Sequence, residues 1–252
     1  MKIPNECKYC GIIKPLCDAH IYPRSWYNSE ELNKIISRLE GQFPKTVRKG
    51  LYDQGITCAE CDNEFGADET YCGQILENFT FTTIGKPVIE VHPQLLRIDA
   101  DGRRMRRAIL FLLWKMTKSQ FIMFANVYNA PYSERIKHEL KNNRGLGFEI
   151  NIFYYEDFIS KGVFFAEPTP RRMLGGVGNT EYRNVIMIPI GRCTIMINVD
   201  SRPIIRPYTD YIVNNTQIYL IPMEFKNNGI CKSSLDIIDS NPNAFTRHRK
   251  QK

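Results

Sequence analysis

Two Cys-x-x-Cys pairs constrain the folding of this chain more than any other feature of its sequence. The first pair is Cys7 and Cys10, and the second is Cys58 and Cys61. Four thiolates offered by two short loops are the ligand set of a closed, tetrahedral zinc site. Because four sulfurs leave no open coordination position, this zinc would fold the segment around it and would not activate water. The alternative is four reduced thiols packed as small apolar side chains, which this spacing favours much less.

The other cysteines are assigned by their distance from these pairs. The sequence holds eight cysteines in all, but a disulfide framework belongs mainly to shorter, secreted chains. The paired spacing therefore favours metal binding in a reducing compartment. Cys17 and Cys72 lie close enough to the pairs in sequence to substitute as ligands, whereas we expect Cys193 and Cys231 in the core.

Length and hydropathy predict a soluble protein. The chain has 252 residues, of which 43% are hydrophobic, and this is enough to bury a core. Its longest apolar run, residues 108–114, ends at Lys115 and is far shorter than the roughly 18 residues of a membrane span. The N-terminus is polar and then rich in cysteine, unlike a secretion signal. We expect a cytoplasmic protein with no membrane partner.

Charge divides the chain into two parts. The net charge is +7, but residues 1–80 hold nine Lys and Arg against twelve Asp and Glu, and the remainder holds twenty-five against fifteen. The first part is too small to build much core unless a metal holds it together. We therefore expect a zinc-stapled module at 1–80 and a larger, basic domain at 81–252 that recognises, regulates or binds a partner.

Hydrophobic periodicity predicts four helices. The first is an amphipathic helix over 28–40, with Ser29 as its cap and Ile35 and Ile36 on its apolar face. A second helix is expected over 62–77, directly after the second cysteine pair. After a turn at Asp101 and Gly102, residues 103–119 form a helix so apolar that it must be central. A short polar helix over 133–140 follows.

The rest of the second part is typical of β-structure. Apolar and β-branched runs predict strands, and those over 184–190 and 192–199 form a hairpin around Gly191. The expected strands are 88–91, 148–154, 163–166, 184–190, 192–199 and 217–221. The fold class is therefore α+β, with a central helix and a mainly antiparallel sheet in the second domain.

One histidine lies in a segment with the features of a catalytic site. His20 stands in the run His-Ile-Tyr-Pro, where Pro23 directs the backbone away from helix, so His20 is a candidate general base near a strand end. Asp53, Asp62 and Asn63 flank the second cysteine pair. Carboxylate and amide oxygens brought beside His20 by a zinc staple would form a site for a hard cation.

This combination resembles the HNH, or ββα-metal, endonuclease family in its zinc-stapled form, over residues of about 5–77. Members similar to this chain have a cysteine pair, a His-Ile-x-Pro strand, an Asp or Asn, a second pair, and then Asp or Asn on a closing helix. The resemblance implies that His20 deprotonates the attacking water while one Mg²⁺ or Mn²⁺ stabilises the leaving oxygen. Asp62 or Asn63 would bind this ion. Asp53 would orient His20 or help to bind the ion.

The chain departs from the family pattern at two positions. Many members have an Asp directly before the histidine, and here that residue is Ala19. The closing helix has no histidine at the last motif position, and Glu69 lies about two turns beyond Asn63 on roughly the same face. Glu69 is therefore either an accessory ligand or part of a surface ion pair. Arg24 could neutralise a phosphate or be merely solvated.

A basic cluster begins the expected central helix. It consists of Arg103, Arg104, Arg106 and Arg107. These side chains could follow a phosphate backbone. Otherwise they form a basic first turn, which the helix dipole disfavours unless anionic groups compensate it. Arg171 with Arg172, and the basic run at 247–252, are weaker candidates for contacts with nucleic acid.

These features predict a metal-dependent endonuclease that cleaves double-stranded DNA. A small nuclease beside a second domain is typical of effectors in bacterial or phage defence. The alternative is a non-catalytic zinc module that docks nucleic acid or a partner protein. Ala19 favours the alternative because it removes a ligand, and the intact histidine strand favours the enzyme.

Overall fold

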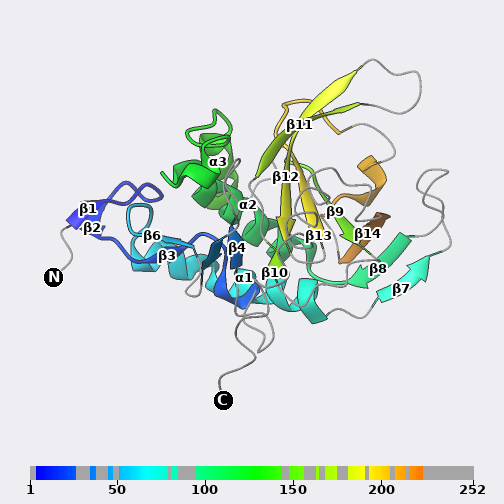
Figure 1. Cartoon of the computed structure of the whole chain (residues 1–252), viewed down its shortest axis with the longest axis horizontal. Helices are drawn as coiled ribbons and strands as arrows, with labels where there is room; N and C mark the ends of the chain where they lie inside the picture. Colours follow the sequence, from blue (N-terminus) through cyan, green and yellow to red (C-terminus); the bar gives the residue numbers. More distant parts are fainter. Residues whose placement is uncertain are drawn as a thin grey trace.

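The fold is seen in a computed structural model, drawn in Figure 1. The structure describes residues 4–26, 35–37, 45–47, 51–78, 81–84, 95–142, 148–155, 163–164, 168–174, 181–190, 193–204, 208–213 and 216–223. A small β-hairpin lies at one end of the molecule and a large sheet at the other, with helix α2 between them (Figure 1). The expected α+β class is confirmed.

The first part of the chain forms two short antiparallel ribbons and a helix. Strands β1 (Pro4–Glu6) and β2 (Ile13–Pro15) pair with each other, as do β3 (Ala19–His20) and β6 (Tyr52–Asp53). A short helix, η1 (Arg24–Trp26), follows β3. Helix α1 (Ala59–Asn78) begins soon after β6 and confirms the helix expected over 62–77. The hairpin of β1 and β2 and the ribbon of β3 and β6 therefore precede helix α1 in the chain.

The helix expected over 28–40 is wrong at its described residues. Residues Ile35–Ser37 form strand β4, which pairs antiparallel with β5 (Lys45–Val47) and parallel with β10 (Val163–Phe164). Two adjacent β-branched isoleucines suit a strand, and hydrogen bonds to two distant segments outweigh a local helical pattern. The remaining residues of 28–40 lie outside the described part of the chain.

Helix α2 (Gly102–Lys118) is the central helix that its apolar sequence predicts. Residues of three successive turns are completely or almost completely buried, among them Ile109, Phe111 and Trp114. The expected turn at Asp101 and Gly102 is wrong, because Asp101 is the helix cap and accepts hydrogen bonds from the amides of the second and third helical residues. Among the helices of the described ranges, none has the length and apolarity that crossing a bilayer requires.

Two shorter helices follow α2, and one of them was expected. These are η2 (Ile122–Phe124) and α3 (Ser133–Asn142), which confirms the helix over 133–140. Helix α3 packs against α2, and α2 packs against α1 (Figure 1). Helix α2 therefore lies between the other two long helices of the described part.

A seven-stranded sheet occupies the second part of the chain. Its order is β11-β12-β13-β9-β14-β8-β7, and every neighbouring pair is antiparallel except β14 and β9. The predicted hairpin is confirmed as β12 and β13, while β7, β8 and β11 were not expected. The strands are β7 (Phe81–Ile84), β8 (Leu95–Asp99), β9 (Ile150–Tyr155), β11 (Thr169–Leu174), β12 (Tyr182–Ile190), β13 (Cys193–Asn198) and β14 (Gln217–Met223), with η3 (Tyr208–Tyr211) before β14. The strand expected at 88–91 lies outside the described residues.

The two expected domains share one hydrophobic core. A single cluster of buried side chains extends from Cys7 in the first hairpin to Leu220 in the large sheet. At its centre, the ring of Phe65 on α1 stacks on Phe111 of α2 at a centroid distance of 4.0 Å, and Tyr9 packs edge-on against Trp114 at 5.1 Å. The first part of the chain is therefore stabilised by apolar packing against the second part, in addition to any metal ion that it binds.

Helix η1 packs unusually close to α1. The indole nitrogen of Trp26 donates a hydrogen bond of 2.7 Å to the carbonyl oxygen of Glu69. A Cβ atom built on Gly73 would lie 2.7 Å from Cδ1 of Trp26 and 2.8 Å from the carbonyl oxygen of Ser25. Glycine at this position therefore permits the contact that holds the chain just after His20 against α1.

Two glycines of α1 give a matched test of this packing. Gly73→Ala should destabilise the protein by about 1–3 kcal/mol, because the added methyl group overlaps backbone and ring atoms. Gly66→Ala on the same helix should stabilise it by up to about 1 kcal/mol, since nothing lies within 4 Å of the added atom and alanine favours helix. Denaturant titration measures both. Equal effects of the two substitutions would contradict the close contact of η1 with α1.

Candidate functional site

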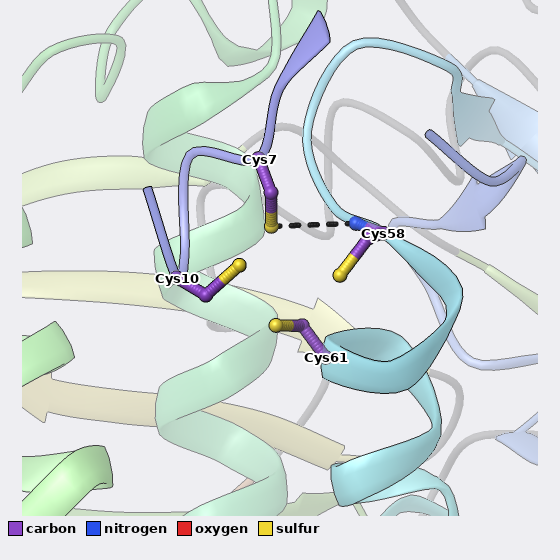
Figure 2. A group of neighbouring side chains, drawn as sticks. All are labelled: Cys7, Cys10, Cys58 and Cys61. Atoms are coloured by element: carbon purple, nitrogen blue, oxygen red, sulfur yellow. Dashed lines mark hydrogen bonds between the residues drawn. The ribbon is translucent and has the colours of Figure 1, made fainter. Parts of the chain in front are cut away.

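The four cysteines of the two pairs converge in the folded chain. Figure 2 shows their side chains directed at a common point, two from the loop of the first hairpin and two from the start of α1. One ligand atom from each of Cys7, Cys10, Cys58 and Cys61 lies within 4.8 Å of all the others. A tetrahedral ion with metal–sulfur bonds of about 2.3 Å needs sulfurs about 3.8 Å apart. The four cysteines could therefore hold a metal ion such as zinc with small adjustments.

Local backbone structure presents each pair. Cys7 and Cys10 occupy the turn between β1 and β2, where the amide of Gly11 donates to the carbonyl of Cys7 at 2.7 Å. Gly11 has φ of +80°, a conformation that glycine adopts without strain. Cys58 directly precedes α1, and Cys61 lies in the first turn of this helix. Each pair therefore lies on a tight, hydrogen-bonded turn that fixes the direction of its thiols.

The electrostatics of the cluster suit a bound cation. Burial opposes ionisation of Cys7, but hydrogen bonds from the backbone amides of Cys10, Cys58 and Tyr9 outweigh it and lower the pKa of this thiol to about 7. One of these amides, that of Cys58, lies 3.3 Å from the sulfur of Cys7 (Figure 2). Burial raises the pKa of both Cys58 and Cys61. A metal ion would offset the cost of ionising these two buried thiols.

The first cysteine pair is anchored in the core shared by both parts of the chain. The ring of Tyr9, between the two cysteines, contacts the rings of Phe65, Phe111 and Trp114. On its other side, the ammonium of Lys8 donates to the carbonyl oxygen of Lys118 at the end of α2. The cluster is therefore supported by α2, which lies far away in sequence.

The two cysteines expected as substitute ligands lie outside the cluster. The thiol of Cys17 donates to the carbonyl oxygen of Thr57 at 3.4 Å, and Cys72 is completely buried on α1. Cys193 is buried in the core as expected, and Cys231 lies outside the described residues. Within the described ranges, the four paired cysteines are the one group of three or more His, Cys, Asp or Glu side chains with ligand atoms so close together.

His20 lies half-buried in strand β3, where its backbone is tightly held. Its cross-strand partner is Tyr52, and the centroids of the two rings are 6.2 Å apart. Ala19 and Ile21, the neighbours of His20, are completely buried. Because side chains alternate along a strand, the imidazole projects from the face of the ribbon opposite to these two residues.

Asp53 lies on the other face of the same ribbon. Its cross-strand partner is Ala19, the residue that replaces the additional Asp of the family pattern. One carboxylate oxygen accepts a hydrogen bond of 2.9 Å from the hydroxyl of Ser119, and the other accepts one of 2.8 Å from the amide of Gly55. The register therefore directs Asp53 and His20 to opposite faces of the ribbon.

Asp62 and Asn63 lie in the first turns of α1. Asp62 is half-buried, and its carboxylate accepts a long hydrogen bond of 3.5 Å from the hydroxyl of Thr57. Asn63 is exposed on the outside of the helix. Arg24 is exposed as well. These three side chains are accessible to an ion or to a phosphate group.

Glu69 forms a buried ion pair that the sequence analysis did not foresee. The ammonium of Lys115, which is 1% exposed, donates to the carboxylate of Glu69 at 2.7 Å and to the carbonyl oxygen of His20 at 2.5 Å. Burial raises the pKa of Glu69, and the charge of Lys115 acts in the opposite direction. A single lysine within an otherwise apolar helix was the available signal, because such a charge is rarely buried without a partner. Lys115 therefore joins α2, α1 and the backbone of the candidate base.

Three of the four clustered arginines on α2 bind carboxylates. Arg104 and Arg107 both pair with Asp68 of α1, at 3.0 and 2.8 Å. Arg106 pairs with Glu139 of α3 at 2.6 Å. These acidic residues supply the anionic compensation that a basic first turn requires. Arg103 is exposed and forms no ion pair with another described residue.

Comparison of the chain with protein-family models, with curated proteins and with solved structures gives no match. The resemblance to the HNH family stays a prediction.

Zinc analysis tests the cysteine cluster. The purified protein should contain a single tightly bound zinc ion, and Cys61→Ser should lose it and unfold at lower temperature, because three sulfurs bind zinc more weakly than four. Cys17→Ser is the matched control, since the Cys17 thiol is hydrogen-bonded to the backbone of Thr57 and lies outside the cluster. Elemental analysis and thermal unfolding measure both properties. Retention of zinc by the Cys61 variant would contradict the assignment.

The buried ion pair gives a second prediction. Lys115→Met should destabilise the protein by about 3–5 kcal/mol, because it leaves the carboxylate of Glu69 buried without its partner. Lys118→Met on the same helix should cost about 1 kcal/mol or less, since its partner Glu134 is largely exposed. Replacing both Lys115 and Glu69 with methionine should cost less than Lys115→Met alone. Denaturant unfolding of the three variants decides this order.

Proposed function

We propose that this chain is a metal-dependent endonuclease of the HNH type that hydrolyses phosphodiester bonds of DNA, with His20 as its general base. The observation that carries the proposal is the order and pairing of the elements around His20. Strand β3 with the histidine, its antiparallel partner β6, and helix α1 occur in this order along the chain, with η1, β4 and β5 between β3 and β6. The cysteine cluster joins the segment before β3 to the start of α1. This is the ββα order of the family that the motifs resemble.

The environment of His20 suits a general base. Its ring lies on the less buried face of the ribbon, where a water and a phosphate can approach. Its carbonyl oxygen accepts a hydrogen bond from the ammonium of Lys115. The amide of the next residue, Ile21, donates to the carbonyl oxygen of Leu51, which directly precedes β6. A base held in this way loses little conformational entropy when substrate binds. In the proposed reaction His20 takes a proton from the attacking water.

Asp62 and Asn63 are the residues proposed to bind the catalytic ion. Mg²⁺ keeps several waters and needs only one or two protein oxygens besides the phosphate, so this accessible pair at the start of α1 is sufficient. When bound, Mg²⁺ or Mn²⁺ would supply positive charge at the leaving oxygen. Asp53 faces away from His20 and is proposed to position the ribbon through Ser119. Zinc at the four cysteines would be structural.

Arg24 and Arg103 are the proposed phosphate contacts. Both are exposed, whereas Arg104, Arg106 and Arg107 are engaged in ion pairs with carboxylates. Arginine binds phosphate through a planar pair of donors, and such contacts supply affinity without reading sequence. Double-stranded DNA as substrate and a setting in bacterial or phage defence stay predictions.

One observation favours a second candidate, a non-catalytic zinc module that docks nucleic acid or a protein. Within the described residues, no group of three or more His, Asp or Glu side chains is gathered as the cysteines are. Metal titration distinguishes the two candidates. The enzyme should bind Mn²⁺ weakly in addition to its zinc, and Asp62→Ala should weaken this binding, whereas the module should bind zinc alone.

A plasmid-nicking assay with Mg²⁺ or Mn²⁺ tests the proposal. His20→Ala should lower the nicking rate by about 100-fold or more, because the water then lacks its general base. His138→Ala is the matched control, since His138 is an exposed histidine on α3 and should leave the rate unchanged. Equal rates for the His20 variant and the parent protein would remove His20 from the mechanism. Unchanged zinc content in both variants would confirm that the fold is intact.

A further inference from the structure

A cavity of about 680 Å³ lies in the second part of the chain, remote in sequence from the cysteines and His20. It is formed by the loop between η2 and α3, by the paired strands β11 and β12, and by Val199. Its volume falls in the range of small-molecule sites, which is about 300–1,000 Å³.

The charge of this cavity is positive. Its lining includes Arg171 and Arg172 and no acidic residue. Both arginines are exposed, and neither forms an ion pair with another residue in the described ranges. Asp200, which accepts a hydrogen bond from the side-chain amide of Asn184, is already engaged by Arg202 at 2.8 Å. Arg171 lies opposite Val185, so its side chain projects from the other face of the sheet, and Arg172 is the cation on the face of Asn184. An arginine without a carboxylate partner at a cavity is a site for an anion, and phosphate matches the geometry of its donors.

The strand register orders the polar groups on one wall. Arg172 of β11 lies directly opposite Asn184 of β12, so both side chains project from the same face of the sheet. The guanidinium of Arg172 lies 4.7 Å from the centroid of the Tyr182 ring, which holds it near the sheet. Ile186 lies on the same face and belongs to the core beneath α2 and α3. This wall therefore combines the guanidinium of Arg172, the amide of Asn184 and the apolar side chain of Ile186.

The loop between η2 and α3 supplies aromatic rings and a hydroxyl that has no hydrogen-bond partner among the described residues. Tyr128 and Tyr132 line the cavity together with Asn126 and Asn129. Tyr132 is only 9% exposed, yet its hydroxyl forms no hydrogen bond to any residue that the structure describes. This hydroxyl is also not among the fully enclosed polar atoms that lack a partner. It is therefore available to a ligand in the cavity, and burying it without one would cost free energy.

We propose that this cavity binds a nucleotide, with the phosphate on Arg172 and the base between the tyrosines and the asparagine amides. Aromatic rings stack on any base, and an asparagine amide can pair with the edge of adenine. The nucleotide is either free or the terminal unit of a single strand. The inference does not depend on the proposed nuclease activity.

Calorimetric titration of the purified 252-residue chain tests the proposal. The probes are adenosine 5′-monophosphate, adenosine, inorganic phosphate, and a single-stranded oligonucleotide with a 5′ phosphate. The mononucleotide or the oligonucleotide should bind at least tenfold more tightly than adenosine or phosphate, because only these ligands engage both walls. Tighter binding of the oligonucleotide assigns the site to a strand end, and equal binding assigns it to free nucleotide.

Three variants connect the binding to the cavity. Arg172→Ala should weaken it by at least about tenfold, and Tyr132→Phe, which removes only the hydroxyl, by about fivefold. Arg97→Ala is the control, because it removes a positive charge from β8, far from β11 in the order of the sheet. Binding of the mononucleotide and the oligonucleotide weaker than about 1 mM would overturn the proposal. So would affinities that neither cavity variant changes, or phosphate binding as tightly as both nucleotide probes.

Discussion

The convergence of four sulfur atoms is the constraint on which the rest of the first part depends. It requires the turn of an N-terminal hairpin to meet the first turn of α1. The antiparallel ribbon of β3 and β6 lies between these two points in the chain, so its ends are fixed by the same contact. Four thiolates would repel one another, and a bound cation compensates their negative charge.

Helix α2 provides the second support. Its aromatic face packs against Tyr9 between the first two cysteines, and its buried Lys115 binds both Glu69 and the backbone of His20. Its arginines are paired with acidic residues of α1 and α3. The proposed catalytic ribbon is therefore held by a helix from the other part of the chain. A division at residue 80 describes the charge pattern better than it describes the packing.

Part of the candidate site could be predicted from the sequence and part could not. The four candidate cysteine ligands and helix α1 could be predicted, because the spacing of residues a few positions apart indicates them without any knowledge of the tertiary structure. The strand at Ile35 was missed because its partners lie in two distant segments. The face from which Asp53 projects depends on its pairing with Ala19. The two paired strands have only two residues each, which is too short for a hydrophobic pattern to reveal their register.

The sequence by itself determined which residues can bind zinc, where α1, α2 and α3 form, and that β12 and β13 make a hairpin. Each of these was predicted from a pattern among residues a few positions apart. Tertiary structure alone decided that Arg104, Arg106 and Arg107 pair with carboxylates, that Lys115 is buried beneath His20, and that a positive cavity forms beside β11. These features join residues that are distant in the chain, and their energies depend on burial, which only the folded packing sets.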